Sequence, residues 1–348
     1  MAKSETPRKR RKVQGVTMMD VAERAGVSPS TVSLFFRNPD AVSAKAGNAV
    51  RTAVRDLNYA PNRMAGGLAS ASSPVVGVIV PSIRNAFFAE TIASLQRGLD
   101  PARLQIMLGQ TEYDQSVEDA LVRTTLSWAP AALVVAGTDH SAATRQLLKA
   151  SGVPVVEIWE LGGETPLDMA VGFDHREVGA AAARHLASRA RRSLVFLSGR
   201  VHEDKRAASR AEGFLAEAKA LGLPARHFDH PAPATTELGG ILFNRVLAEL
   251  GNEDAVGIGC SNDHIALGVL FEAQRQARSI PGDYAVMGFG DLEFASSAAP
   301  ALSTIRPFGD VIGSETARLI LGRRAGLEDT DRTSIIDTGF RVVQRQTT

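Results

Sequence analysis

The sequence predicts a small all-α helix-turn-helix headpiece followed by a large α/β region built on two doubly wound parallel sheets. Three observations predict this fold class. Residues 17–38 contain two helix signatures separated by a glycine. From residue 72 onward, short apolar runs alternate with amphipathic stretches, which is typical of parallel strands joined by helices. Residues 1–73 hold twelve Lys or Arg and five Asp or Glu, although the whole chain has a net charge of only +1, so positive charge is concentrated at the amino end.

The two helices at residues 17–38 have distinct start and stop signals. Thr17, with Asp20 three positions later, predicts a capping box, and Gly26 ends the first helix. Ser28 caps the second helix, whose first position is Pro29. The outward face of this helix comprises Ser30, Thr31, Ser33, Leu34 and Arg37. Because a helix-turn-helix places its second helix in the major groove, small polar residues there indicate DNA reading, with an ordinary helical hairpin as the alternative.

A third helix is expected from about Ser43 to Leu57, followed by NYAPNR. Together, the stretches DVAERAGVSPSTVS, VSAK and LNYAPNRMA resemble the DNA-binding headpiece of the LacI/GalR family of bacterial transcription regulators. The resemblance implies that a hinge helix follows, enters the minor groove and wedges Leu68 between base pairs. The DNA-binding residues expected from the pattern and the resemblance are Thr17, Met18, Pro29, Ser30, Thr31, Ser33, Leu34, Arg37, Ser43, Tyr59, Asn62 and Leu68.

Two departures from the family pattern bear on mechanism. Gly66 and Gly67 lie inside the expected hinge helix, and each costs about 1 kcal/mol relative to Ala in a helix interior, so the hinge should be poorly helical without DNA. Leu34 stands where many relatives carry arginine, so a guanidinium contact to guanine is missing and base choice should be altered.

The segments around the headpiece give the expected domain boundaries. Residues 1–15 should form a basic disordered arm, in which PRKRRKV is a nonspecific phosphate contact rather than a nuclear localisation signal. The other expected segments are the headpiece at 16–61, the hinge helix and linker at 62–73, and an effector-binding and dimerisation domain at 74–348. The single cysteine, Cys260, excludes an intramolecular disulfide. Without an 18-residue apolar run or a signal peptide, the expected location is the cytoplasm, with no membrane partner.

Nine strands are expected, at residues 75–80, 104–110, 131–137, 153–159, 169–173, 193–199, 225–230, 255–260 and 284–290. They read as buried parallel strands in two sheets. The stretches IVPSIRNAFFAE, VGFDHREVGAAAARHL, SNDHIALGVL, IPGDYAVMGFGD and PALSTIRP resemble the family's two-lobed domain, which is like a periplasmic sugar-binding protein. The resemblance implies a first lobe of about 74–173 and 306–333, and a second lobe of about 174–302 and 334–348.

Ligands in open α/β sheets bind beyond the carboxyl ends of the strands, which predicts an effector site between the lobes. The expected effector-binding residues are Asn85, Phe87, Phe88, Trp159, Asp174, Arg206, Arg210, Asn262, Asp263 and Asp291. Phe87, Phe88 and Arg210 also match family positions that line the effector cleft. The alternatives are that one of the two phenylalanines belongs to the core, that the arginines are solvated, and that Asp263 caps its own helix.

The class of effector is predicted from the absence of an acidic side chain at position 290. At Gly290 many sugar-responsive relatives have an acidic residue, and its loss opposite the arginines favours an anionic ligand. The stretches SWAPAALVV and DMAVGFDHREVG resemble the gluconate-utilisation repressors of the family, so we expect a sugar acid such as gluconate or a ketogluconate. A neutral sugar or a phosphorylated sugar is the alternative effector. The expected assembly is a homodimer on a palindromic operator, as an inducible or a corepressed regulator.

Enzyme functions lack their sequence signals. No G-x-G-x-x-G follows a first strand, and the chain has no P-loop, G-x-S-x-G or metal-spaced His/Cys cluster. His202, His227 and His230 lie near acidic residues without a positioned nucleophile. We therefore expect no catalytic residue, metal or cofactor. A transport-type sugar-binding protein is the other alternative, and the missing signal peptide and the headpiece argue against it.

Overall fold

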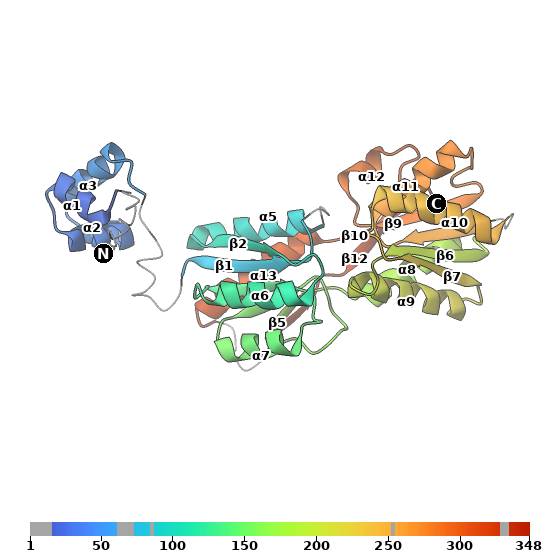
Figure 1. The fold of residues 1–348 in the computed structure, drawn as a ribbon, viewed down its shortest axis with the longest axis horizontal. Helices are drawn as coiled ribbons and strands as arrows, with labels where there is room; N and C mark the ends of the chain where they lie inside the picture. The colour runs from blue at the N-terminus through green and yellow to red at the C-terminus, as the bar shows by residue number, and fades with distance from the viewer. Residues whose placement is uncertain (1–15, 61–72, 84–86, 252–254, 328–333) are drawn as a thin grey trace, which may run out of the picture. The chain divides into compact units, whose positions relative to one another are not determined.

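The computed structural model describes residues 16–60, 73–83, 87–251, 255–327 and 334–348, and the chain divides into two units, Met1–Ala71 and Ser72–Thr348 (Figure 1). Among the expected features, the basic arm, Asn62, the hinge residues Gly66, Gly67 and Leu68, and the effector candidate Asn85 lie outside the described residues. No described helix has the length and apolar character needed to cross a membrane.

The first unit is the expected three-helix headpiece. Its helices are α1 (Met18–Ala25), α2 (Pro29–Arg37), the 3-10 turn η1 (Pro39–Ala41) and α3 (Ala44–Asp56). The capping box of Thr17 and Asp20 is present, and Gly26 ends α1 with a left-handed φ of +65°. The three helices pack on a core of Val21, Ala22, Val32, Phe35, Val50 and Ala53. The local signals read from the sequence are therefore confirmed in this unit.

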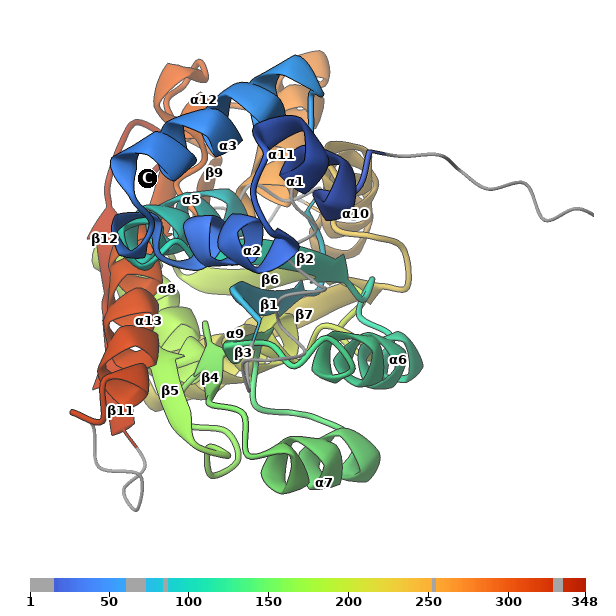
Figure 2. The same cartoon turned by 90° about the vertical axis from the view of Figure 1, so that its left-hand side faces the viewer.

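The second unit contains two six-stranded sheets. The first has the order β11-β5-β4-β3-β1-β2 and is entirely parallel. Its strands are β1 (Val75–Val80), β2 (Gln105–Gln110), β3 (Ala132–Ala136), β4 (Val155–Ile158), β5 (Met169–Gly172) and β11 (Ser334–Asp337). Its helices are α5 (Phe87–Leu99) with the turn η2 (Asp100–Ala102), α6 (Gln115–Leu126), α7 (Ala142–Ser151) and α13 (Gly309–Arg324). Figure 2 shows α13 on one side of this sheet and α6 and α7 on the other.

The second sheet has the order β12-β10-β9-β8-β6-β7, with β12 antiparallel to β10. Its strands are β6 (Ser193–Gly199), β7 (Ala225–His230), β8 (Val256–Cys260), β9 (Tyr284–Phe289), β10 (Ser303–Pro307) and β12 (Phe340–Val343). Its helices are α8 (His175–Ser188), α9 (Lys205–Ala220), α10 (Thr236–Leu250), α11 (Asp263–Arg275) and the short α12 (Glu293–Ser297). In Figure 1, α10 and α11 cover one face of this sheet, and α8 and α9 cover the other.

Two expectations about the strands need correction. The chain was expected to pass from the first lobe to the second at residue 334. It does so after β11 instead, because β11 pairs with β5 of the first sheet. Only Thr338 and Gly339 separate β11 from β12, which belongs to the second sheet. The pairing partners of two four-residue strands are set by tertiary contacts that leave no local signal. The strand β2 was also expected to be buried, yet it is an edge strand, and Leu108 is 43% exposed.

Helices α8 and α9 touch at their backbones, and this contact positions the site. A Cβ added to Gly179 would lie 1.9 Å from the Arg210 carbonyl oxygen, and one added to Gly213 would lie 2.0 Å from the Arg176 carbonyl oxygen. Both glycines are therefore required by the close approach of the helices. The approach brings the amino end of α8 against the middle of α9, so that His175 meets Arg210.

Candidate effector site and DNA-reading helix

Arg210 is a buried cation whose side-chain hydrogen bonds go to neutral groups. Its Nη1 donates to His175 Nδ1 at 2.9 Å and its Nη2 to the Ser261 carbonyl at 3.0 Å, while the guanidinium lies 4.3 Å from the centre of the Phe289 ring. Burial lowers its pKa only to about 10, so the group is charged at neutral pH. The charges of Asp204 and Glu160 act to raise this pKa, but neither carboxylate bonds the guanidinium, and Arg210 Nε and Ser261 Oγ are both buried without a hydrogen-bond partner.

His175 connects this cation to the first lobe. Arginine can only donate, so Nδ1 accepts, and Nε2–H then donates to the Trp159 carbonyl at 2.9 Å. Burial, followed by the charges of Arg210 and Arg206, holds the His175 pKa well below its ordinary value, so the ring is neutral. Sequence analysis did not single out this residue. Its position directly after the expected site residue Asp174, at the end of a strand, was the available signal.

Aromatic side chains line the same region. Trp159 has a left-handed φ of +71°, and its Nε1 donates to Thr91 Oγ1 at 3.0 Å. Phe87 is half-buried, with its ring 6.3 Å from Trp159 and 5.7 Å from Phe289. Phe88 is only 5% exposed and belongs to the core, which is the alternative stated for one of the pair.

Gly290 is explained by the same packing. A Cβ at this position would lie 2.1 Å from Phe87 Cε1, and its φ is +129°. An acidic side chain therefore has no room at position 290 while Phe87 occupies this place. Around it lies the aromatic hollow of about 290 Å³, lined by Phe87, Ala89, Glu90, Trp159, Gly290, Asp291, Leu292, Glu293, Arg306, Pro307 and Gly309.

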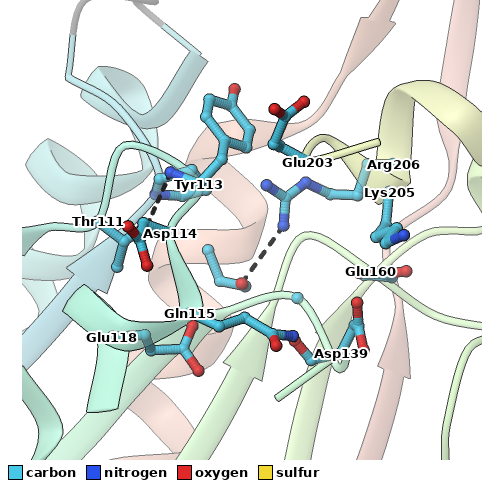
Figure 3. A pocket seen from close by; sticks show the side chains of 13 residues that line it. Thr111, Tyr113, Asp114, Gln115, Glu118, Asp139, Glu160, Glu203, Lys205 and Arg206 are labelled. Atoms are coloured by element: carbon cyan, nitrogen blue, oxygen red, sulfur yellow. Dashed lines mark hydrogen bonds between the residues drawn. The ribbon is translucent and has the colours of Figure 1, made fainter. Parts of the chain in front are cut away.

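Arg206 reaches across a second space, the polar hollow. Figure 3 shows its guanidinium pointing from α9 toward β3, where Nη1 donates to the Ala136 carbonyl at 3.3 Å. Burial raises the pKa of Glu160, and the charge of Arg206 opposes that rise. The polar hollow encloses about 60 Å³ and is lined by Pro81, Thr111, Tyr113, Asp114, Gln115, Glu118, Ala136, Gly137, Asp139, Glu160, Glu203, Lys205 and Arg206. Of these, only Arg206 was among the expected effector residues.

Three of the remaining expected residues have structural partners. Asp174 is exposed and caps α8, and Asn262 caps α11 while its amide donates to the Ala234 carbonyl. Burial raises the pKa of Asp263 to about 6, opposed by bonds from Thr304 Oγ1 at 2.6 Å and the Leu292 amide at 2.8 Å. This carboxylate therefore ties α11 to β10 and to the turn after β9.

Asp291 lines the aromatic hollow but is already paired. Its Oδ1 accepts from Arg345 Nη2 at 2.6 Å, and its Oδ2 lies 3.8 Å from Arg306 Nη1. Arg306 also lies 3.5 Å from Glu90 Oε1 on α5. The structure thus brings together Phe87, Trp159 and Asp291 in one hollow, Arg206 in the other, and Arg210 among buried aromatic rings.

A serine, a histidine and an aspartate also meet on the second sheet. Ser198 Oγ lies 2.7 Å from His227 Nε2 and 3.2 Å from Asp229 Oδ1. The aspartate bonds the serine rather than the histidine, and Ser198 is fully buried, so this is not the geometry of an activated nucleophile. In the described part of the chain, no three His, Cys, Asp or Glu side chains are grouped to hold a metal.

On the headpiece, the candidate DNA contacts lie at the helix starts and along α2. Ser30 and Arg37 are exposed, and Thr31, Ser33 and Leu34 are half-buried. Thr17, Ser43 and the first residue of α2, Pro29, are exposed, as is Met18 at 37%. Tyr59 is half-buried, with its ring 6.1 Å from Phe36, so it also supports the headpiece core.

The fold and the two candidate sites define a class: a helix-turn-helix DNA-binding regulator with a ligand-binding domain of the periplasmic-binding-protein type. The family model for bacterial regulatory proteins of the lacI family matches residues 17–62, and the model for a periplasmic binding protein-like domain matches residues 183–348.

Several known proteins are similar over nearly the whole chain. The HTH-type transcriptional regulator GntR of Pseudomonas aeruginosa is 36% identical over 334 residues, which cover 95% of each chain. The regulator of the same name in Escherichia coli K12 is 30% identical, covering 93% of this chain and 96% of the relative. A solved LacI-family regulator from Silicibacter pomeroyi has a TM-score of 0.86 at 31% identity, covering 95% of this chain and 99% of that chain. The chain therefore belongs to the LacI family of bacterial transcriptional regulators.

Replacing Leu34 by Arg should shift base preference toward guanine at the contacted position by about 1–3 kcal/mol, because a guanidinium bonds both O6 and N7 of guanine and leucine bonds neither. Competition binding with single-base operator variants measures the shift. Thr52→Arg, at an exposed position on α3, adds the same charge away from the reading helix and is the control. Equal tightening on every operator variant would place residue 34 against phosphate instead.

Proposed function

We propose that the protein is a homodimeric repressor of a sugar-acid catabolic operon, acting in the bacterial cytoplasm, and that a sugar acid of the gluconate or ketogluconate type binds between its lobes and changes its affinity for DNA. One observation carries the effector class: Arg210 is buried and charged, and its hydrogen bonds go to a neutral histidine and a carbonyl rather than to a described carboxylate. A buried charge without a partner is costly, so an anionic ligand that supplies the partner binds with a large advantage.

The buried Arg210 and the polar hollow suit the two ends of such a ligand. The carboxylate end would take the unpaired Arg210 Nε and Ser261 Oγ, while the hydroxylated chain would extend toward the carboxylate-rich polar hollow. That hollow encloses about 60 Å³, whereas small-molecule sites measure roughly 300–1,000 Å³. Ligand entry therefore requires the lobes to move, and this movement gives the effector its influence on the rest of the chain.

The dimer is proposed from an apolar groove of about 410 Å³ on the second lobe. The groove is lined by Leu267, Leu270, Phe271, Gln274, Phe294, Ser297, Ala298 and Ala299. Phe271 is 46% exposed there, although large apolar side chains are normally covered. A second copy placed on this surface by a twofold axis would present two reading helices to a palindromic operator.

The DNA side of the proposal uses the expected domain boundaries. The headpiece at 16–61 would read base edges through α2, the arm at 1–15 would contact phosphates, and the hinge at 62–73 would place Leu68 in the minor groove. The effector would act on this assembly as a coupling free energy, typically about 1–3 kcal/mol, between the cleft and the operator.

A ligand screen by calorimetry and thermal shift tests the effector class, using sugar acids, the matching neutral sugars and sugar phosphates. We expect gluconate or a ketogluconate to bind and, at about 100 times its Kd, to stabilise the protein by about 2.7 kcal/mol. The same ligand should change operator affinity in fluorescence anisotropy. Binding of neutral or phosphorylated sugars alone would contradict the sugar-acid proposal and leave the DNA-binding assignment standing.

A further inference from the structure

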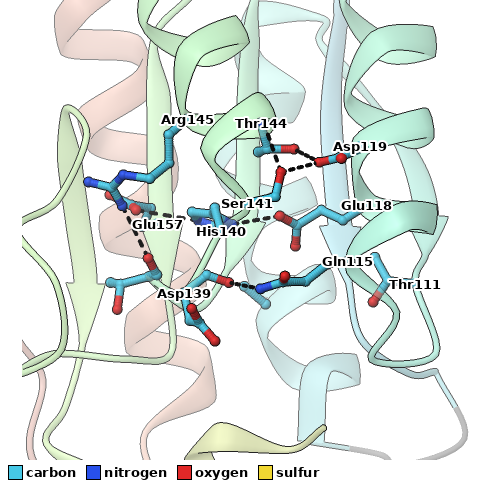
Figure 4. A network of polar contacts seen from close by, with 12 residues as sticks. Thr111, Gln115, Glu118, Asp119, Asp139, His140, Ser141, Thr144, Arg145 and Glu157 are labelled. Atoms are coloured by element: carbon cyan, nitrogen blue, oxygen red, sulfur yellow. Dashed lines mark hydrogen bonds and ion pairs between the residues drawn. The ribbon is translucent and has the colours of Figure 1, made fainter.

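A buried imidazole lies between two carboxylates beside the polar hollow. His140 Nδ1 lies 2.7 Å from Glu118 Oε1, and its Nε2 lies 3.4 Å from Glu157 Oε1. The side chains of His140 and Glu157 are 1% and 0% exposed, and that of Glu118 is 13% exposed. Figure 4 shows the three groups in a row, from α6 through the loop after β3 to β4. We call them the Glu118 cluster.

The charges of the Glu118 cluster are fixed by its geometry. Burial alone lowers the pKa of His140, but the hydrogen bonds and charges of Glu118 and Glu157 outweigh it and raise the pKa to about 9. His140 is therefore protonated at neutral pH, between the side chains of the two glutamates. Glu157 Oε2 also accepts from the Leu167 amide at 2.6 Å, which holds the inner carboxylate to the loop between β4 and β5.

Glu118 is the member of the cluster that reaches the polar hollow. Within the described residues, its only bonded partner is His140, through Oε1. Glu118 Oε2 has no bonded partner among the described residues, and the cations Lys205 and Arg206 line the same hollow. A carboxylate oriented in this way accepts hydrogen bonds from ligand hydroxyl groups, whereas it offers nothing to an alkyl chain.

We propose that the Glu118 cluster selects effectors that carry hydroxyl groups: Glu118 accepts from the hydroxylated chain, and His140 is the positioning residue that fixes the orientation of Glu118. This inference rests on the proposed effector function and deepens it. Arg210 accounts for the acid end of the ligand, and the Glu118 cluster accounts for the polyol end.

The neighbouring residue on α6 provides a matched control. Asp119 bonds Ser141 Oγ at 2.5 Å and also Thr144 Oγ1, so it ties α6 to the start of α7 as Glu118 ties it to His140. Asp119 does not line the polar hollow. Asp119→Asn should therefore change stability without changing ligand selectivity.

The experiment compares three ligands of equal chain length in the full-length protein: gluconate, hexanoate, which lacks the hydroxyls, and glucitol, which lacks the acid. Glu118→Gln keeps the shape and an oxygen for His140 to donate to. We expect it to weaken gluconate and glucitol binding about tenfold and to leave hexanoate unchanged within about twofold, because only hydroxyl contacts are lost. His140→Gln should lower the gluconate-to-hexanoate affinity ratio in the same direction.

The affinity ratio separates selection from folding, because a purely structural role changes all three ligands alike. Equal loss for gluconate and hexanoate in Glu118→Gln, or an Asp119→Asn variant with the same drop in ratio, would overturn the inference. If the wild type binds glucitol but not gluconate, the sugar-acid proposal fails, and the glucitol data for Glu118→Gln then decide the inference. If no hydroxylated ligand binds, both are overturned.

Discussion

Replacing Arg210 by Ala should weaken binding of the sugar-acid effector by about 2 kcal/mol or more, a loss of roughly 30-fold in affinity. The guanidinium lies in a buried setting where a charge-assisted bond to a carboxylate is worth more than at the surface, and its present hydrogen bonds go to His175 and the Ser261 carbonyl. Calorimetric titration of wild type and variant with gluconate measures the change. Lys219→Ala, an exposed position on the same helix, is the control and should leave affinity unchanged.

The free energy of unfolding of Arg210→Ala without ligand tests the role of the Arg210 charge independently. Removing a buried cation that forms no ion pair relieves a desolvation cost, and this relief offsets the lost hydrogen bonds to His175 and Ser261 and the lost packing against Phe289. We therefore expect Arg210→Ala to fold with little change in its free energy of unfolding. A folded variant that binds gluconate as tightly as the wild type would remove Arg210 from the effector site. Arg210→Lys keeps the charge without the planar fork and should give an intermediate affinity.

The parts of the fold that could be predicted from the sequence are those with local causes. The capping box at Thr17, the left-handed Gly26 and the cap at Ser28 each act within four residues, and the structure has all three. The central strands follow from continuous apolar runs. The lobe of β11 could not be predicted, because its pairing with β5 joins residues more than 150 positions apart.

The site residues also divide into those that the sequence could predict and those that depend on tertiary contacts. Arg206 and Arg210 were expected from their place after a strand, and Arg210 also from the resemblance. The partners of Arg210 were not expected, because His175 and Ser261 reach it only through the contact of α8 with α9 and the end of β8. Asp263, by contrast, was expected in the effector site but has structural partners. Its place after a strand indicated a ligand contact, yet its oxygens bond Thr304 and Leu292, which no spacing rule places beside it.

Deleting residues 1–73 should abolish operator binding and leave effector binding intact. The deleted segment contains every candidate DNA contact and an excess of seven positive charges, while the whole chain has a net charge of +1. What is left is therefore acidic. It loses the base readout, which makes specific binding about 10³–10⁷-fold tighter than nonspecific binding, and it also loses the nonspecific attraction to phosphates.

Both hollows and the partners of Arg210 come from residues after position 73, within the unit that forms contacts of its own from Ser72 onward. Calorimetry with gluconate should therefore give the same Kd for the truncated and the full-length protein, while anisotropy with an operator selected by the full-length protein should show no binding by the truncation. A folded truncation with weakened effector affinity would mean that the headpiece or the hinge contributes to the cleft. Coupling between two sites is reciprocal, so the loss in effector affinity would also measure the free energy by which the headpiece favours the effector-binding arrangement of the lobes.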